Sequence, residues 1–87
     1  MAVYVDHGRI AFRGMLMCHM VADTLEELHE MADKIGLKRT WFQPYSSPHY
    51  DISQSKRSLA VAEGAIEIDM RQLARLLRKW REQKMGS

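Results

Sequence analysis

The sequence holds a single cysteine among its 87 residues, so no internal disulfide bond can form and a reducing compartment suits the chain. Its apolar runs fall short of the roughly 18 residues that a membrane-spanning helix needs. The N-terminal segment MAVYVDHGR has no basic stretch followed by an apolar one, which is the pattern of a secretory signal. We therefore expect a cytoplasmic protein that does not enter a membrane.

Several motifs of well-known sites are also missing. Neither Gly-x-Gly-x-x-Gly nor the Walker pattern occurs, which argues against the standard glycine-rich nucleotide loops. No two histidines have the His-x-x-x-His spacing of helical zinc sites. Cys18 adjoins His19, but adjacent residues on a strand point to opposite faces, so they cannot pair for nucleophilic catalysis. On these grounds we assign no cofactor and no metal ion.

The composition is that of one small globular domain spanning residues 1–87, because 46% of the residues are hydrophobic and 28% are charged. So short a chain buries a small core, and self-association is a common way to bury more area. We therefore expect a homo-oligomer. The charge is uneven: residues 1–37 have a net charge of −3 and residues 38–87 a net charge of +5. The basic excess permits contact with an acidic partner.

Short apolar segments alternate with helical patterns along the chain. We expect strands at 2–6, 15–22, 39–43 and 65–68, a further edge strand at 10–12, and helices at 24–35, 53–63 and 69–83. This order, β-β-α-β-α-β-α, predicts an α/β domain with a short, mostly parallel sheet and three helices.

Local signals mark the ends of these helices. Thr24 and Glu27 form a Thr-x-x-Glu capping box, and Gly36 supplies the stop of the first helix. Segment 44–51 contains two prolines and two serines, which predicts a loop before the second helix. Asp51 or Ser53 would cap that helix.

An ordered set of motifs links the chain to a known family. VYVD, MCHMVAD, LEELHEMADKIG, WFQ, HYDIS and AVAEGAIEID cover most of residues 2–69. Together they resemble the small bacterial and bacteriophage family catalogued as domain of unknown function 4031. The resemblance implies a short cytoplasmic or phage protein without an assigned reaction, and it transfers no catalytic residue to this chain.

Polar residues follow the ends of the expected strands. In open α/β sheets, ligands bind outside the carboxyl ends of parallel strands, so these residues would line one pocket together with segment 43–57. The ligand-binding candidates are Asp6, Trp41, Gln43, His49, Tyr50 and Arg57, and the catalytic candidates, if the protein is an enzyme, are His19, His49 and Asp51.

Each candidate also has a structural interpretation. Asp51 would cap a helix, and Tyr50 would anchor the loop by apolar contact. His19, in an apolar strand, would be a core histidine bonded to a carboxylate or carbonyl, or else an acid, base or phosphate donor beside His49. Arg57 would be solvated, or it would hold an anion near the start of the second helix.

Three functions remain open. The first is a binding module that holds a small anionic ligand, such as a nucleotide or phosphorylated metabolite, in this pocket. The second is a hydrolase or phosphoryl-transfer enzyme with His49 or His19 as acid or base and Asp51 as its orienter. The third is a nucleic-acid or protein-interaction module that works through the basic helix at 69–84.

Overall fold

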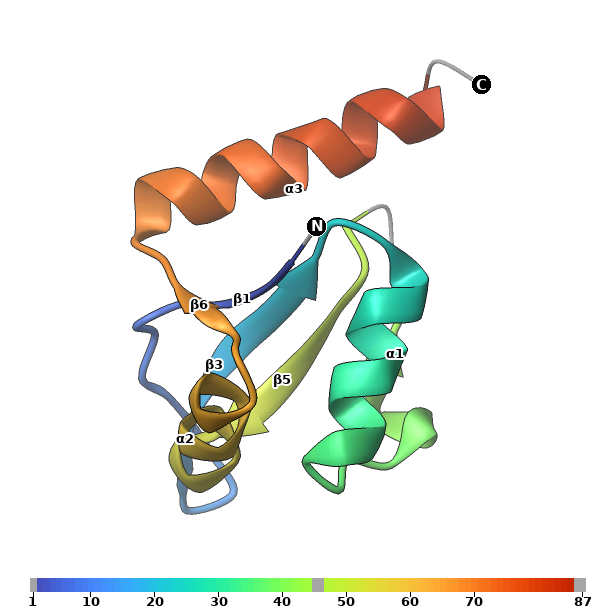
Figure 1. The fold of residues 1–87 in the computed structure, drawn as a ribbon. Coiled ribbons are helices and arrows are strands. Elements are labelled where there is room, and N and C mark those ends of the chain that lie inside the picture. The colour runs from blue at the N-terminus through green and yellow to red at the C-terminus, as the bar shows by residue number, and fades with distance from the viewer. Residues whose placement is uncertain (1, 45–46, 86–87) are drawn as a thin grey trace.

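Strand β3 (Met15–Ala22) lies at the centre of the sheet, because its apolar run can bury side chains on both faces. The computed structural model describes residues 2–44 and 47–85. One side of β3 pairs with β1 (Val3–Val5) and β2 (Ile10–Phe12), and the other side pairs with β5 (His49–Ser53). Figure 1 shows β3 and β5 running side by side. These pairings hold the residues of the candidate site.

The sheet is mixed and mostly antiparallel, so the expected mostly parallel sheet is wrong. Its strand order is β4-β5-β3-β1-β6, with β4 at Phe42–Gln43 and β6 at Ile66–Glu67, and only β1 and β6 pair in parallel among the described strands. The chain does cross over through a helix from β3 to β4, and these two strands run in the same direction. However, β5 lies between them and is antiparallel to both.

Strand β5 arises from a segment that we expected to be a loop. The prolines of the segment lie before the strand, and from His49 onward the residues alternate between half-buried and buried. This alternation, in only five residues, is the period-2 pattern of a strand. Segment 39–43 also differs, because Arg39–Trp41 forms a 3-10 turn, η1, and only Phe42–Gln43 pairs as a strand.

Three helices cover the sheet as the sequence predicts. They are α1 (Leu25–Lys34), α2 (Gln54–Ala62) and α3 (Met70–Met85). The main core lies on the face covered by α1 and α2, and it includes Val5, Met20, Leu28, Tyr50, Ile52 and Ala60. Helix α3 packs on the other face through a smaller cluster that contains Val21, Ile68 and Leu73. Figure 1 shows α3 crossing the sheet apart from the other two helices.

The apolar stripe of α3 is used within the chain. Leu73 is buried against the sheet, and the indole N–H of Trp80 donates to the carbonyl of Ala22 at 2.9 Å. Homo-oligomerisation stays a prediction that rests on the small core. Within residues 2–44 and 47–85, no helix has the length and apolar character to cross a membrane.

The helix ends follow the capping signals. Thr24 accepts a hydrogen bond from the backbone N–H of Glu27, and Gly36 adopts a φ of 80°, the left-handed conformation that favours glycine. At the second helix, Ser53 is the cap, because its hydroxyl oxygen accepts from the N–H of Lys56. Asp51 lies two residues earlier, inside β5, and does not cap the helix.

We therefore expect Ser53→Ala to lower the free energy of unfolding by about 1 kcal/mol, the usual value of a lost N-cap. Chemical denaturation measures this change. Ser58→Ala is the matched control, because the exposed Ser58 hydroxyl lies inside α2 and donates to the carbonyl of Gln54, four residues earlier in the same helix. An equal loss in Ser58→Ala, or no loss in Ser53→Ala, would contradict the assigned cap.

Candidate functional site

The register of β3 and β5 brings two candidate residues into direct contact. His19 lies opposite Asp51, and their neighbours Cys18 and Met20 lie opposite Ile52 and Tyr50. Directly opposed residues of an antiparallel pair project to the same face. Cys18, Met20, Tyr50 and Ile52 are buried in the main core, so His19 and Asp51 project to the other face of the sheet.

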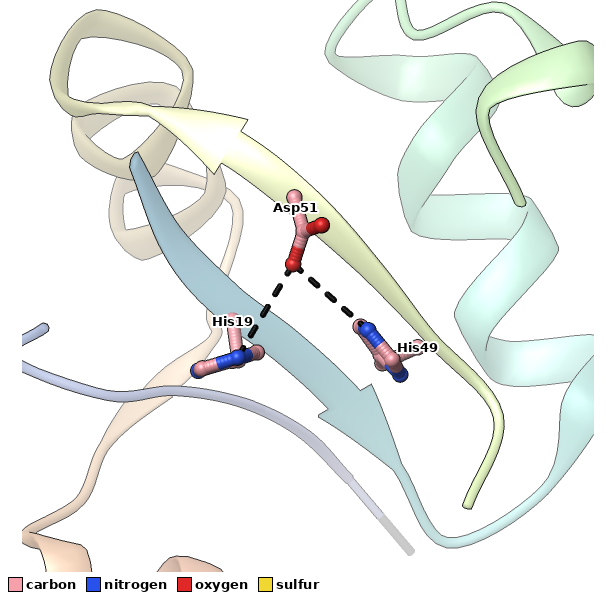
Figure 2. A group of neighbouring side chains, drawn as sticks. All are labelled: His19, His49 and Asp51. Carbon is pink, nitrogen blue, oxygen red and sulfur yellow. Dashed lines mark ion pairs between the residues drawn. The ribbon is translucent and has the colours of Figure 1, made fainter. Parts of the chain in front are cut away.

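His49 joins this pair because it lies two residues before Asp51 on the same strand. The Nε2 atom of His49 lies 3.5 Å from Oδ1 of Asp51, and Nε2 of His19 lies 3.9 Å from the same oxygen. Figure 2 shows the three side chains converging from the two strands. We call His19, His49 and Asp51 the β3–β5 cluster. One donor atom from each residue lies within 4.8 Å of the others.

Both imidazoles are held through their other ring nitrogen. Nδ1 of His19 lies 2.8 Å from Oδ2 of Asp6, and Nδ1 of His49 lies 2.9 Å from the carbonyl oxygen of Ser47. A carbonyl oxygen and a carboxylate can only accept, so each Nδ1 carries the proton and donates it. In the neutral rings, each Nε2 therefore keeps a free lone pair, and both Nε2 atoms lie within 3.9 Å of Oδ1 of Asp51.

Asp6 supports His19 from the end of β1 and is fully buried. One of its carboxylate oxygens accepts from the backbone N–H groups of His19 and Gly8, and the other accepts from the His19 ring. Burial alone would raise the pKa of Asp6, but these hydrogen bonds outweigh it and hold the pKa below its usual value. Asp6, expected to bind a ligand, thus lies behind the cluster.

Gln43 lies next to the cluster on β4, directly opposite His49 in the strand register. Tyr50 points the other way: its side chain is fully buried and its hydroxyl bonds to Nδ1 of His29 at 2.9 Å. Tyr50 is therefore the apolar anchor that the sequence indicated, and it does not face the cluster. His29, in α1, is half-buried.

Arg57 and Trp41 lie outside the cluster. The Nε of Arg57 donates to the backbone carbonyl of Asp6, and its Nη2 contacts Glu67 at 2.9 Å and His7 at 3.1 Å. Trp41, in η1, is 46% exposed, with the Lys38 ammonium over its ring. Three of the expected site residues thus form the β3–β5 cluster, and Asp6 and Gln43 lie beside it. The other expected residues, Tyr50, Arg57 and Trp41, lie outside the cluster.

One contact of the cluster, between the Ser47 carbonyl and the His49 ring, was not predicted from the sequence. The carbonyl oxygen of Ser47 fixes the His49 ring, and a backbone acceptor leaves no signal in the residue types. Ser47 also reaches α3, because its hydroxyl donates to the carbonyl of Leu77 at 3.4 Å. The loop before β5 therefore connects the cluster to the last helix.

Comparison with family models gives a match over residues 3–80, to a family described as a protein of unknown function, DUF4031. The chain belongs to the DUF4031 family. The match covers most of the chain and includes every residue of the β3–β5 cluster together with Asp6 and Ser47. Comparison with curated proteins and with solved structures gives no match.

We expect Asp6→Asn to lower the free energy of unfolding at neutral pH by about 1–3 kcal/mol, because its buried donors lose a charged acceptor. Since the folded-state pKa of Asp6 lies below the ordinary 3.8, its ionised form stabilises the fold above that pH. This contribution is lost as the pH falls through the folded-state pKa. The difference between wild type and variant should therefore shrink in acid.

Urea denaturation at neutral and acidic pH measures this difference. Asp33→Asn is the control, because Asp33 is an exposed carboxylate whose pKa is also lowered, through its hydrogen bond to Arg39. The control should lose much less stability, since exposed ion pairs contribute little. Equal losses in both variants, or a gap that widens in acid, would be inconsistent with a buried, ionised Asp6.

Proposed function

We propose that the protein is a small hydrolase or phosphoryl-transfer enzyme whose active site is the β3–β5 cluster. One observation supports this proposal above the others: Nε2 of His19 and Nε2 of His49 both lie within 3.9 Å of the same Asp51 oxygen. Three proton-accepting groups whose atoms lie within 4.8 Å of one another are suited to activating a water molecule or another hydroxyl for attack.

A binding module without chemistry has less support. Two residues that we expected to hold an anionic ligand are used elsewhere, because Arg57 contacts Asp6 and Glu67 and Tyr50 is buried in the core. The cluster, by contrast, remains partly open to solvent. The side chains of His19, His49 and Asp51 are 28%, 21% and 45% exposed. A substrate can therefore reach part of the cluster from solvent.

The substrate class that we propose is a phosphate ester. Helix α3 adjoins the cluster through Leu77 and Ser47, and Ser47 in turn holds His49. The helix exposes the basic side chains Arg71, Arg75, Arg78, Lys79 and Arg81. A cationic surface next to a site raises the local concentration of anionic substrates. The same surface supports the alternative of nucleic-acid contact, which salt-dependent binding to duplex DNA would test.

We expect the purified chain to hydrolyse p-nitrophenyl phosphate or bis(p-nitrophenyl) phosphate when assayed with and without added divalent metal ions. His49→Ala and Asp51→Ala should each lower kcat/KM by at least about 100-fold, the lower range for a group that takes part in proton transfer. His7→Ala is the control, because His7 is an exposed histidine outside the cluster. Circular dichroism establishes that each variant is folded.

Two results would count against this function. The first is the absence of turnover with both esters by folded wild-type protein, with or without metal ions. The second is turnover that survives in His49→Ala and Asp51→Ala alike, which would trace the activity to a contaminant or to another site.

A further inference from the structure

We infer that His19, His49 and Asp51 bind one divalent transition-metal ion of the zinc class. The inference rests on the same site as the proposed function and supplies the means by which that site activates water. It has its own test, because metal binding is measurable without turnover. The sequence alone gave no metal assignment, since positions 19, 49 and 51 match no ligand-spacing motif.

The chemistry of the donors points to a cation. Both Nδ1 protons are donated, to Asp6 and to the Ser47 carbonyl. The cluster therefore contains two Nε2 lone pairs and one carboxylate. These are three electron-pair donors with no donor proton among them when the rings are neutral. Two histidines and one carboxylate are a recurrent ligand set of catalytic zinc and of non-haem iron. A divalent ion satisfies all three groups at once.

The distances suit such an ion after a small adjustment. Ligands at about 2.0–2.1 Å from a tetrahedral zinc ion lie roughly 3.3 Å from one another. The two contacts to Asp51 are 3.5 and 3.9 Å, and the three ligand atoms lie within 4.8 Å of one another, so the ligands would close in around a bound ion. The imidazole rings are not stacked, because their centroids are 5.4 Å apart and their planes meet at 68°. The two rings therefore meet edge to face.

The support behind the ligands is a second, independent observation. Metal-binding histidines almost always donate their other ring N–H to a carboxylate or a backbone carbonyl, which fixes the tautomer and the ring orientation. Here His19 donates to the carboxylate of Asp6, and His49 donates to the backbone carbonyl of Ser47. Asp6 is fully buried and held by two further N–H groups, so the His19 ring has a rigid support.

If His19, His49 and Asp51 held a zinc ion, three protein ligands would leave one coordination position for water. A zinc ion lowers the pKa of bound water to about 7, so the water loses a proton to solvent and becomes hydroxide near neutral pH. The hydroxide oxygen then bonds to the phosphorus of the ester while the bond from phosphorus to the leaving oxygen breaks. The leaving oxygen takes a proton from water, which balances the reaction.

Calorimetry of the full chain with zinc chloride tests the inference, after the purified protein has been stripped of metal by a chelator. We expect one ion per chain, and Co²⁺ in its place should give the intense visible bands of four-coordinate cobalt. His19→Ala, His49→Ala and Asp51→Ala should each weaken binding by more than about 100-fold, since even lost outer contacts cost 10–100-fold. His7→Ala should bind as wild type does.

Asp6→Asn distinguishes a supporting role from a general structural one. The amide can no longer hold the ring of His19 as a carboxylate does, so zinc affinity should fall by about 10–100-fold while one ion per chain still binds. Nitrogen chemical shifts of the His19 ring should report the changed hydrogen bond at Nδ1. An unchanged affinity in a folded Asp6→Asn protein would contradict the assigned support.

The metal inference and the proposed function fail in different ways. Folded wild-type protein that binds neither zinc nor cobalt, or whose alanine variants bind as tightly as wild type, overturns the metal site. If ester hydrolysis then persists in the presence of a chelator, the cluster works by direct proton transfer and the proposed function stands. If the protein binds metal tightly through the cluster but hydrolyses neither ester, the metal site is supported and the proposed reaction is wrong.

Discussion

The pairing register between β3 and β5 is the constraint on which the rest of the structure depends. It places Cys18 and Met20 against Ile52 and Tyr50 in the main core, and it sets His19 opposite Asp51 on the other face. A slip by one residue would turn the core side chains toward solvent and the polar pair into the core. Core packing and the candidate site are therefore held by the same set of backbone hydrogen bonds.

Asp6 extends this constraint to the first strand and to α2. Its carboxylate holds the ring and the backbone of His19, while its own carbonyl accepts from Arg57 in α2. Arg57 in turn forms an ion pair of 2.9 Å with Glu67 in β6. A buried carboxylate is unfavourable without hydrogen-bond donors, and here His19 in β3 supplies its ring N–H and backbone N–H, and Gly8 supplies its backbone N–H. The network thus ties the cluster to a rigid part of the fold.

Much of the secondary structure could be predicted from local signals. The capping box at Thr24, the stop at Gly36 and the apolar run of β3 are short-range patterns, and each indicates its element without knowledge of the rest of the chain. The strand at His49–Ser53 was missed because five residues give a weak pattern and the prolines before them resemble a loop. With β5 left out, β3 and β4 looked like neighbours joined by a helical crossover, which made the sheet look parallel.

The candidate site, like the sheet, was predicted only in part. The residue types drew attention to His19, His49 and Asp51, yet the reason given for their convergence, the shared end of parallel strands, was wrong. They meet because antiparallel neighbours β3 and β5 place residues 32 positions apart directly opposite each other, as in His19 and Asp51. The sequence by itself determined the helices, the buried strand and the membership in the DUF4031 family. Only the tertiary structure decided strand direction, the role of Asp6 and the orientation of both imidazoles, because these depend on contacts between residues far apart in the chain and on backbone acceptors that no side chain reveals.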